Sequence, residues 1–140
     1  MGTSETFDHT ADVGLRVWGN SLDDVFQTAA EGLFDLIVAN RKDIRLDEVE
    51  KVSMHAESVG ELLAAWLGEL IFRSEIQHVV FGAFEVRVDE EMVRLDATLR
   101  GERIDPERHV LDHEVKAVTR HGLALEREGD GWKAELILDI

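Results

Sequence analysis

The segment Gly129-Asp-Gly-Trp-Lys-Ala-Glu-Leu-Ile-Leu-Asp139-Ile140 determines how the end of the chain folds. Two glycines around an aspartate are typical of a tight turn between antiparallel strands. Residues 114–126, before this turn, are predicted to form the first strand of a hairpin, and Trp132 begins the second. Because three apolar residues precede Asp139, we expect the chain end to be held in a strand and its last acidic side chain to be fixed in position.

Strand patterns also occur earlier in the chain. Residues 79–88 and 92–99 predict another hairpin, with Asp89-Glu-Glu91 as its turn. Apolar and polar residues alternate over residues 13–18, which indicates a strand with one buried face. Residues 44–56 form a mixed stretch with weaker alternation of the same kind.

Two segments have the spacing of amphipathic helices. Ser21 is expected to cap a helix that reaches about residue 38, and Ser58 to cap a second helix with Glu61 completing a capping box. Apolar residues recur every three or four positions in both segments. They are Leu22, Val25, Phe26, Ala29, Ala30, Leu33, Phe34 and Ile37 in the first, and Leu62, Leu63, Trp66, Leu67, Leu70 and Ile71 in the second.

Together these elements predict an α+β fold, with two helices packed on an antiparallel-rich β-sheet. No linker, low-complexity segment or long-period repeat divides the chain, so we expect a single domain over residues 1–140. Residues 1–6 are expected to be a flexible tail.

The charge of the chain limits the classes of partner. Its 30 acidic and 15 basic residues give a formal net charge of −15. This charge repels phosphate backbones, so we expect no extended contact with nucleic acid and favour cations and basic protein surfaces as partners. The absence of cysteine excludes disulfides, thiolate zinc sites and cysteine nucleophiles. Neither a membrane span nor a secretory signal is visible, so we expect a cytoplasmic protein.

Acidic groups stand near both ends of the chain. One cluster is Phe7-Asp8-His9-Thr-Ala-Asp12-Val-Gly14, and the other is Asp139 beside the terminal carboxylate of Ile140. If the ends meet, Asp12, Asp139 and Ile140 form an oxygen-rich cation site. The alternatives are a local turn motif around Asp8 and a solvated C-terminus.

Lys116 is the most notable cation in the predicted C-terminal hairpin. It shares one strand face with Glu114, so the two could form a surface charge pair. A functional role would instead place Lys116 near the carboxylates, where it balances their charge or contacts a phosphate. Arg108 and His109 lie in a polar turn, where such residues are more often exposed than catalytic.

Several segments, in the same order along nearly the whole chain, resemble the archease family. They are residues 7–14, Glu61-Leu-Leu-Ala-Ala-Trp66-Leu-Gly-Glu-Leu70-Ile-Phe, Asp105-Pro-Glu-Arg108-His109, Glu114-Val-Lys116-Ala-Val-Thr119-Arg-His121, Gly131-Trp132-Lys-Ala and the terminal Leu138-Asp139-Ile140. The chain departs from the family at Arg120, where an aromatic residue is usual, and at Asp8, where glutamate is common.

This resemblance implies a non-enzymatic accessory protein of the RtcB-type RNA ligase in tRNA splicing. Archeases promote the guanylylation of that ligase, which uses GTP and a divalent metal, and its repeated turnover. The resemblance implies that Asp12 and Asp139 bind the cation, that an oxygen of Ile140 completes the site, and that Lys116 is functionally important. Oxygen ligands suit Ca²⁺ or Mg²⁺ better than a soft metal.

Two other functions remain open at this stage. The family resemblance also allows a chaperone or modulator of tRNA-modifying enzymes such as a methyltransferase. The other is a metal-dependent hydrolase, which would need His9 as a base because two carboxylates alone do not activate a nucleophile.

Overall fold

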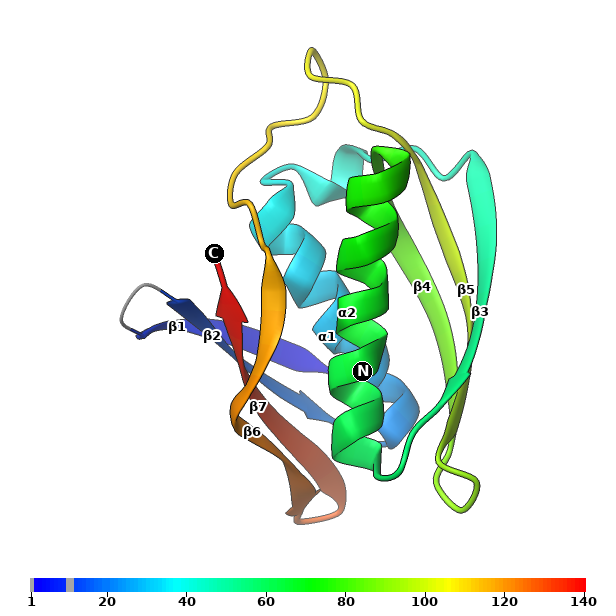
Figure 1. The fold of residues 1–140 in the computed structure, drawn as a ribbon, viewed down its shortest axis with the longest axis vertical. Coiled ribbons are helices and arrows are strands. Elements are labelled where there is room, and N and C mark those ends of the chain that lie inside the picture. Colours follow the sequence, from blue (N-terminus) through cyan, green and yellow to red (C-terminus); the bar gives the residue numbers. More distant parts are fainter. Residues whose placement is uncertain (1, 10–11) are drawn as a thin grey trace.

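The computed structural model describes residues 2–9 and 12–140 of the chain (Figure 1). None of the helices in this described part is long and apolar enough to cross a membrane. The elements follow one another as β1 (Thr3–His9), β2 (Asp12–Gly19), α1 (Leu22–Ile37), the 3₁₀ helix η1 (Arg41–Asp43), β3 (Glu48–His55), α2 (Val59–Gln77), β4 (Val79–Asp89), β5 (Arg94–Arg103), β6 (Ala117–Glu128) and β7 (Gly131–Asp139).

The strands form two sheets with the helices between them (Figure 1). One sheet has the order β1-β2-β7-β6 and the other the order β3-β5-β4, and all the pairs are antiparallel. The predicted α+β class, with two helices and antiparallel strands, is confirmed. The strands divide into two sheets because each sheet can bury one apolar face against the shared helix layer.

Both predicted helix caps are present. The Ser21 hydroxyl accepts a hydrogen bond from the backbone N–H of Asp24, and the Ser58 hydroxyl accepts one from that of Glu61. Each cap satisfies one of the N–H groups that the first turn of a helix leaves unpaired. The two predicted helix starts are therefore confirmed, as α1 and α2.

Aromatic side chains fill the space between the layers. Phe34 of α1 contacts Phe81 and Phe84 of β4, with ring centroids 5.7 Å apart in both pairs. Trp66 of α2 is fully buried, and its indole N–H donates to the carbonyl oxygen of Phe26 at 3.0 Å. The indole thus joins the two helices without leaving its polar atom unpaired.

The expectation of a flexible tail at residues 1–6 is wrong, because β1 begins at Thr3 and pairs with β2 along its whole length. The ring of Phe7 lies over Gly14, where a Cβ atom would overlap it. The Arg16 guanidinium stacks on that ring, 4.1 Å from its centroid, and pairs with Glu5. An edge strand of mostly polar, exposed residues has little hydrophobic alternation, so its sequence pattern is weak.

The predicted C-terminal hairpin is present, but its first strand begins at Ala117 rather than at residue 114. The turn lies between Glu128 and Gly131, and Gly129 has the positive φ of 60° that favours glycine there. The register shifts between Thr119 and Ala124, so residues 120–123 bulge from the ladder.

Candidate functional site

The pairing of β2 with β7 brings the two acidic ends of the chain together. Asp12 is the Cα partner of Asp139. Direct partners in an antiparallel ladder have Cα atoms about 4.5–5.5 Å apart and direct their side chains to the same face. The pair three residues further along the two strands, Leu15 with Leu136, lies on the opposite face and is fully buried. Asp12 and Asp139 therefore share the face of the sheet that points away from the helices.

The end of the chain is anchored beside this pair. Ile140 is half-buried and packs against the hydrophobic core, which keeps its terminal carboxylate next to Asp139. The main-chain oxygen of Asp139 accepts a hydrogen bond from the backbone N–H of Lys116 at 2.7 Å. The oxygens that Ile140 itself can provide are those of its terminal carboxylate.

Lys116 lies close to Asp139 through its backbone and immediately precedes β6, whose first residue, Ala117, is the cross-strand partner of Asp139. Its side chain lines two hollows against α2, one of about 350 Å³ beside Ser74 and one of about 290 Å³ beside Gly68. Glu114 and Lys116 precede β6, so the predicted pairing within a strand does not apply to them.

Part of the N-terminal acidic motif lies outside the described residues. Thr10 and Ala11 are not described, and neither are the side chains of Asp8 and His9, although the backbone of His9 pairs with that of Asp12. Within the described chain, no group of three or more His, Asp or Glu side chains could hold a metal ion. The described protein donors are therefore two aspartates and the terminal carboxylate.

This donor set fits a hard divalent cation. All its atoms are oxygens, which Ca²⁺ and Mg²⁺ prefer over nitrogen or sulfur. Mg²⁺ in particular is commonly bound by one or two carboxylates, with water or the phosphates of a substrate as its other ligands. Asp12, Asp139 and Ile140 could hold such an ion where the two central strands β2 and β7 end, and it would remain accessible there to a second molecule.

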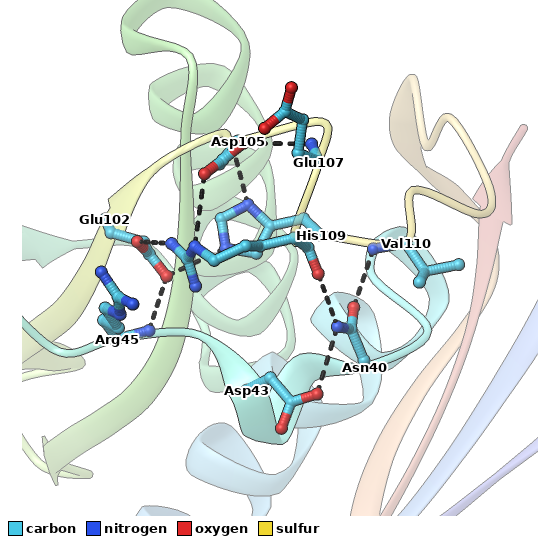
Figure 2. A network of polar contacts seen from close by, with 9 residues as sticks. Asn40, Asp43, Arg45, Glu102, Asp105, Glu107, His109 and Val110 are labelled. Carbon is cyan, nitrogen blue, oxygen red and sulfur yellow. Dashed lines mark hydrogen bonds and ion pairs between the residues drawn. The ribbon is translucent and has the colours of Figure 1, made fainter.

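A separate polar cluster surrounds Glu102, near the end of β5 (Figure 2). The connection between β5 and β6, residues 104–116, begins at this cluster and ends at Lys116. Glu102 and His109 are only 8% and 3% exposed. The Glu102 Oε2 atom accepts hydrogen bonds from the backbone N–H of Arg45 at 2.7 Å and from His109 Nε2 at 2.9 Å. The guanidinium of Arg108 binds the other oxygen, Oε1.

The protonation of His109 follows from its hydrogen bonds. The backbone N–H of Asp105 donates to His109 Nδ1 at 2.8 Å, so Nδ1 has no proton. The proton is then on Nε2 and is donated to Glu102. The ring therefore has a fixed tautomer and orientation, and it links the start of the connection to β5.

Asn40 fastens the same connection to the end of α1 (Figure 2). Its side-chain amide donates to the carbonyl oxygen of Arg108 at 2.8 Å, and its side-chain oxygen accepts the N–H of Val110 at 2.8 Å. The next residues pair with the α1 end, through His113 N–H to Leu36 O at 2.9 Å. The connection that leads to Lys116 is thus fixed to the rest of the protein along most of its length.

The environment of Glu102 keeps its carboxylate ionised. Burial alone would raise the pKa of Glu102, but the hydrogen bonds from Arg45, His109 and Arg108 and the charge of Arg108 lower this pKa from 4.5 to about 2. A buried carboxylate with this many donors is stable only as an anion.

The contribution of Glu102 to stability is expected to decrease in acid. Because its pKa is lower in the folded chain, ionised Glu102 stabilises the fold above pH 4.5, and this contribution is lost as the pH falls through about 2. In urea denaturation, the difference in free energy of unfolding between the wild type and Glu102→Ala should narrow from about pH 5 to about pH 3. A constant difference would show that the carboxylate charge does not hold the cluster together.

The sequence reasoning missed this cluster. The expectation that His109 is exposed in a turn is wrong, because the imidazole is buried between Asp105 and Glu102. A signal was present in the alternating charges of Glu102, Arg103, Asp105 and Arg108 around a single proline. A buried histidine needs hydrogen-bond partners, and the carboxylates of such a run can provide one.

Comparison with known proteins identifies the family. The model of the archease protein family (MTH1598/TM1083) matches residues 5–140. The curated archease of Pyrococcus abyssi is 40% identical over 139 residues, which cover 97% of both chains. That of Methanopyrus kandleri is 39% identical over 138 residues, covering 97% of this chain and 98% of its own. The chain therefore belongs to the archease family, as the resemblance predicted.

Solved structures agree with this assignment. The solution structure of Methanobacterium thermoautotrophicum protein 1598 is 35% identical, with a TM-score of 0.86 over 98% of both chains. A crystal structure from Thermotoga maritima, described as an archease and possible chaperone, is 23% identical with a TM-score of 0.65, covering 99% of this chain and 98% of its own. The second likeness concerns the fold alone.

Proposed function

We propose that this protein activates an RtcB-type RNA ligase in tRNA splicing, by means of a divalent cation held by Asp12, Asp139 and Ile140. It acts as an accessory that promotes guanylylation and repeated turnover of the ligase and does not itself join RNA. The observation that carries this proposal is the pairing of Asp12 with Asp139 beside the chain end. Membership of the archease family supports the choice of partner.

The geometry suits the delivery of an ion to a partner. Asp12 and Asp139 would hold the ion at the ends of β2 and β7, and the anchored Ile140 carboxylate would supply a further oxygen beside them. The remaining coordination positions would face outward, where GTP phosphates and ligase groups can supply ligands. The net charge of −15 favours association with a basic nucleotide- and RNA-binding surface, so docking is expected to weaken at high salt.

Removing either carboxylate should abolish stimulation of the ligase. We expect Asp12→Asn and Asp139→Asn to lose calorimetric binding of Mg²⁺ or Ca²⁺ and to stimulate guanylylation at least about tenfold less than the wild type, because each removes one of two side-chain ligands. The readout is transfer of radiolabelled GMP from GTP to the ligase, with and without this protein.

Asp130→Asn is the matched control for these variants. Asp130 lies in the turn between β6 and β7, at the opposite end of β7 from Asp139, and the substitution makes the same change in charge. Thermal unfolding of all three variants would verify that they remain folded. Normal stimulation by Asp12→Asn and Asp139→Asn would refute the cation mechanism.

A second candidate function is that of a chaperone or modulator of tRNA-modifying enzymes such as a methyltransferase. The exposed apolar side chains Phe72 and Ile76 favour it, because such groups bind partly unfolded clients. Under this alternative, the wild type and Asp139→Asn would protect unrelated aggregating proteins equally well. Protection of no client by either protein would eliminate it.

A further inference from the structure

Three consecutive rows of cross-strand neighbours lie on the solvent face of the four-stranded sheet, beginning at its two paired aspartates. Residues two positions apart on a strand point to the same side of a sheet. The rows on β1, β2 and β7 therefore share one face, opposite the buried pair of Leu15 and Leu136. Counted from the chain end, they contain Asp12 with Asp139, then Phe7 with Gly14 and Ile137, then Glu5 with Arg16 and Glu135.

The middle row depends on its glycine. The ring of Phe7 occupies the space above Gly14, and a Cβ atom at Gly14 would overlap the Cζ atom and both Cε atoms of that ring. Gly14 is buried although it lies on the solvent face, which agrees with a ring lying over it. Any larger residue at position 14 would have to displace the ring, so this contact between β1 and β2 requires glycine.

The third row restrains the same ring. The Arg16 guanidinium lies 4.1 Å from the ring centroid and pairs with Glu5 on β1 at 3.1 Å and with Glu135 on β7 at 3.3 Å. A cation over a ring at an exposed site contributes about 0.5–1 kcal/mol, and an exposed ion pair about 0–1 kcal/mol. These contacts add little stability, but they fix the direction of the ring and join the three strands whose ends lie beside the aspartates.

Ile137 shows that the middle row excludes water. It is only 6% exposed, although it faces away from the helices and lies outside the main hydrophobic core. Gly14 places no side chain between Ile137 and the Phe7 ring. The bulge of β6 covers Ile137 from the other neighbouring strand, where a Cβ atom on Gly122 would lie 3.6 Å from it. Phe7 and Ile137 thus form an apolar surface next to the two aspartates, which we call the apolar floor.

An apolar floor affects ion binding in two ways. It keeps water from one side of the carboxylates, which lowers the local dielectric constant and strengthens their attraction for a cation. The seated ring also holds β1 on β2 next to Asp12, so Asp12 is kept opposite Asp139 before an ion arrives. A ligand that is already held in place loses less conformational freedom on binding.

We propose that Phe7 and Gly14 are positioning residues of the cation site, and that their contact keeps Asp12 opposite Asp139 beside the apolar floor. This inference rests on the proposed function, because it names the residues that shape the same site. Neither side chain has an atom that could bind the ion, so both act through the aspartates.

The test is calorimetric titration of the purified protein with CaCl₂ and with MgCl₂, for Phe7→Ala, Gly14→Ala and the double variant. We expect each single substitution to raise the Kd of the ion at least about tenfold, as changes to the groups around metal ligands do. Because both substitutions remove one contact, the double variant should raise the Kd no more than the larger single effect. Independent effects would instead multiply to about a hundredfold.

The variants are expected to remain folded, and thermal unfolding would verify this. The nearest atoms to the new methyl of Gly14→Ala all belong to the half-buried Phe7 ring, which lies on the edge strand β1 and can turn outward. Phe72→Ala and Gly60→Ala are the matched controls. Phe72 is 59% exposed on α2, and a Cβ atom at Gly60 would meet nothing within 4 Å, so both should leave the Kd unchanged.

The outcomes separate this inference from the proposed function. A wild-type protein that binds neither ion would remove the cation site and this inference with it. If the wild type binds an ion and both single variants keep its Kd, the positioning role is overturned and the cation site stands, even where the unfolding temperature falls. Effects that multiply in the double variant would show that the two residues act separately, and would overturn the shared contact.

Discussion

Replacing Glu102 by alanine is expected to lower the free energy of unfolding by about 3–5 kcal/mol at pH 7, the usual cost of removing one partner from a buried ion pair. The substitution deprives the Arg45 N–H and the buried His109 Nε2 of their acceptor. It also removes one of the two carboxylates that pair with the Arg108 guanidinium, leaving Asp105. Urea denaturation followed by circular dichroism would measure the change.

Glu85→Ala is the control for this prediction. Glu85 also pairs with an arginine, but its side chain is 75% exposed and 3.9 Å from Arg100. Exposed pairs of this kind contribute about 0–1 kcal/mol. If Glu102→Ala cost no more than Glu85→Ala, the cluster would not contribute to stability, and the connection to Lys116 would be held by Asn40 and by backbone contacts.

The difference between these two carboxylates shows what could be predicted from the sequence. Patterns over a few residues determined the caps at Ser21 and Ser58 and the C-terminal turn, because those structures depend on local backbone groups. The same patterns did not reveal which charged residues would be buried. Glu102 and Glu85 both lie in charged stretches, but only Glu102 is buried by the approach of Arg45, Arg108 and His109.

The candidate site was predictable in part for a similar reason. The sequence predicted a C-terminal strand that fixes the chain end and an acidic motif around the start of β2, so the two ends could be expected to meet. In the structure, the register of β2 with β7 brings Asp12 opposite Asp139. The position of Lys116 was not predictable, because the predicted strand from residue 114 begins only at Ala117 and leaves Lys116 in the preceding connection. A start three residues later removes the strand geometry from which its pairing with Glu114 was expected.

Replacing Gly101 by alanine is expected to destabilise the protein by about 3 kcal/mol or more, at the upper end of the range for overpacking in a core. Gly101 lies in the central strand β5 and pairs with Glu48 on one side and Phe81 on the other. A Cβ atom there would overlap the carbonyl oxygen of Val80 and lie 2.9 Å from the Cα of Phe81. Both are backbone atoms, which cannot rotate away as a side chain can.

The close approach arises from the bulge in β4, whose register against β5 shifts between Phe81 and Ala83. Gly68→Ala provides the opposite case, because a Cβ atom at Gly68 would meet nothing within 4 Å. That substitution should stabilise α2 by up to about 1 kcal/mol, since alanine is the better helix former.

Because Gly101 adjoins Glu102, strain in β5 should also disturb the carboxylate cluster, so the effects of Gly101→Ala and Glu102→Ala should not add. Additive effects would mean that the bulge and the cluster stabilise the fold independently.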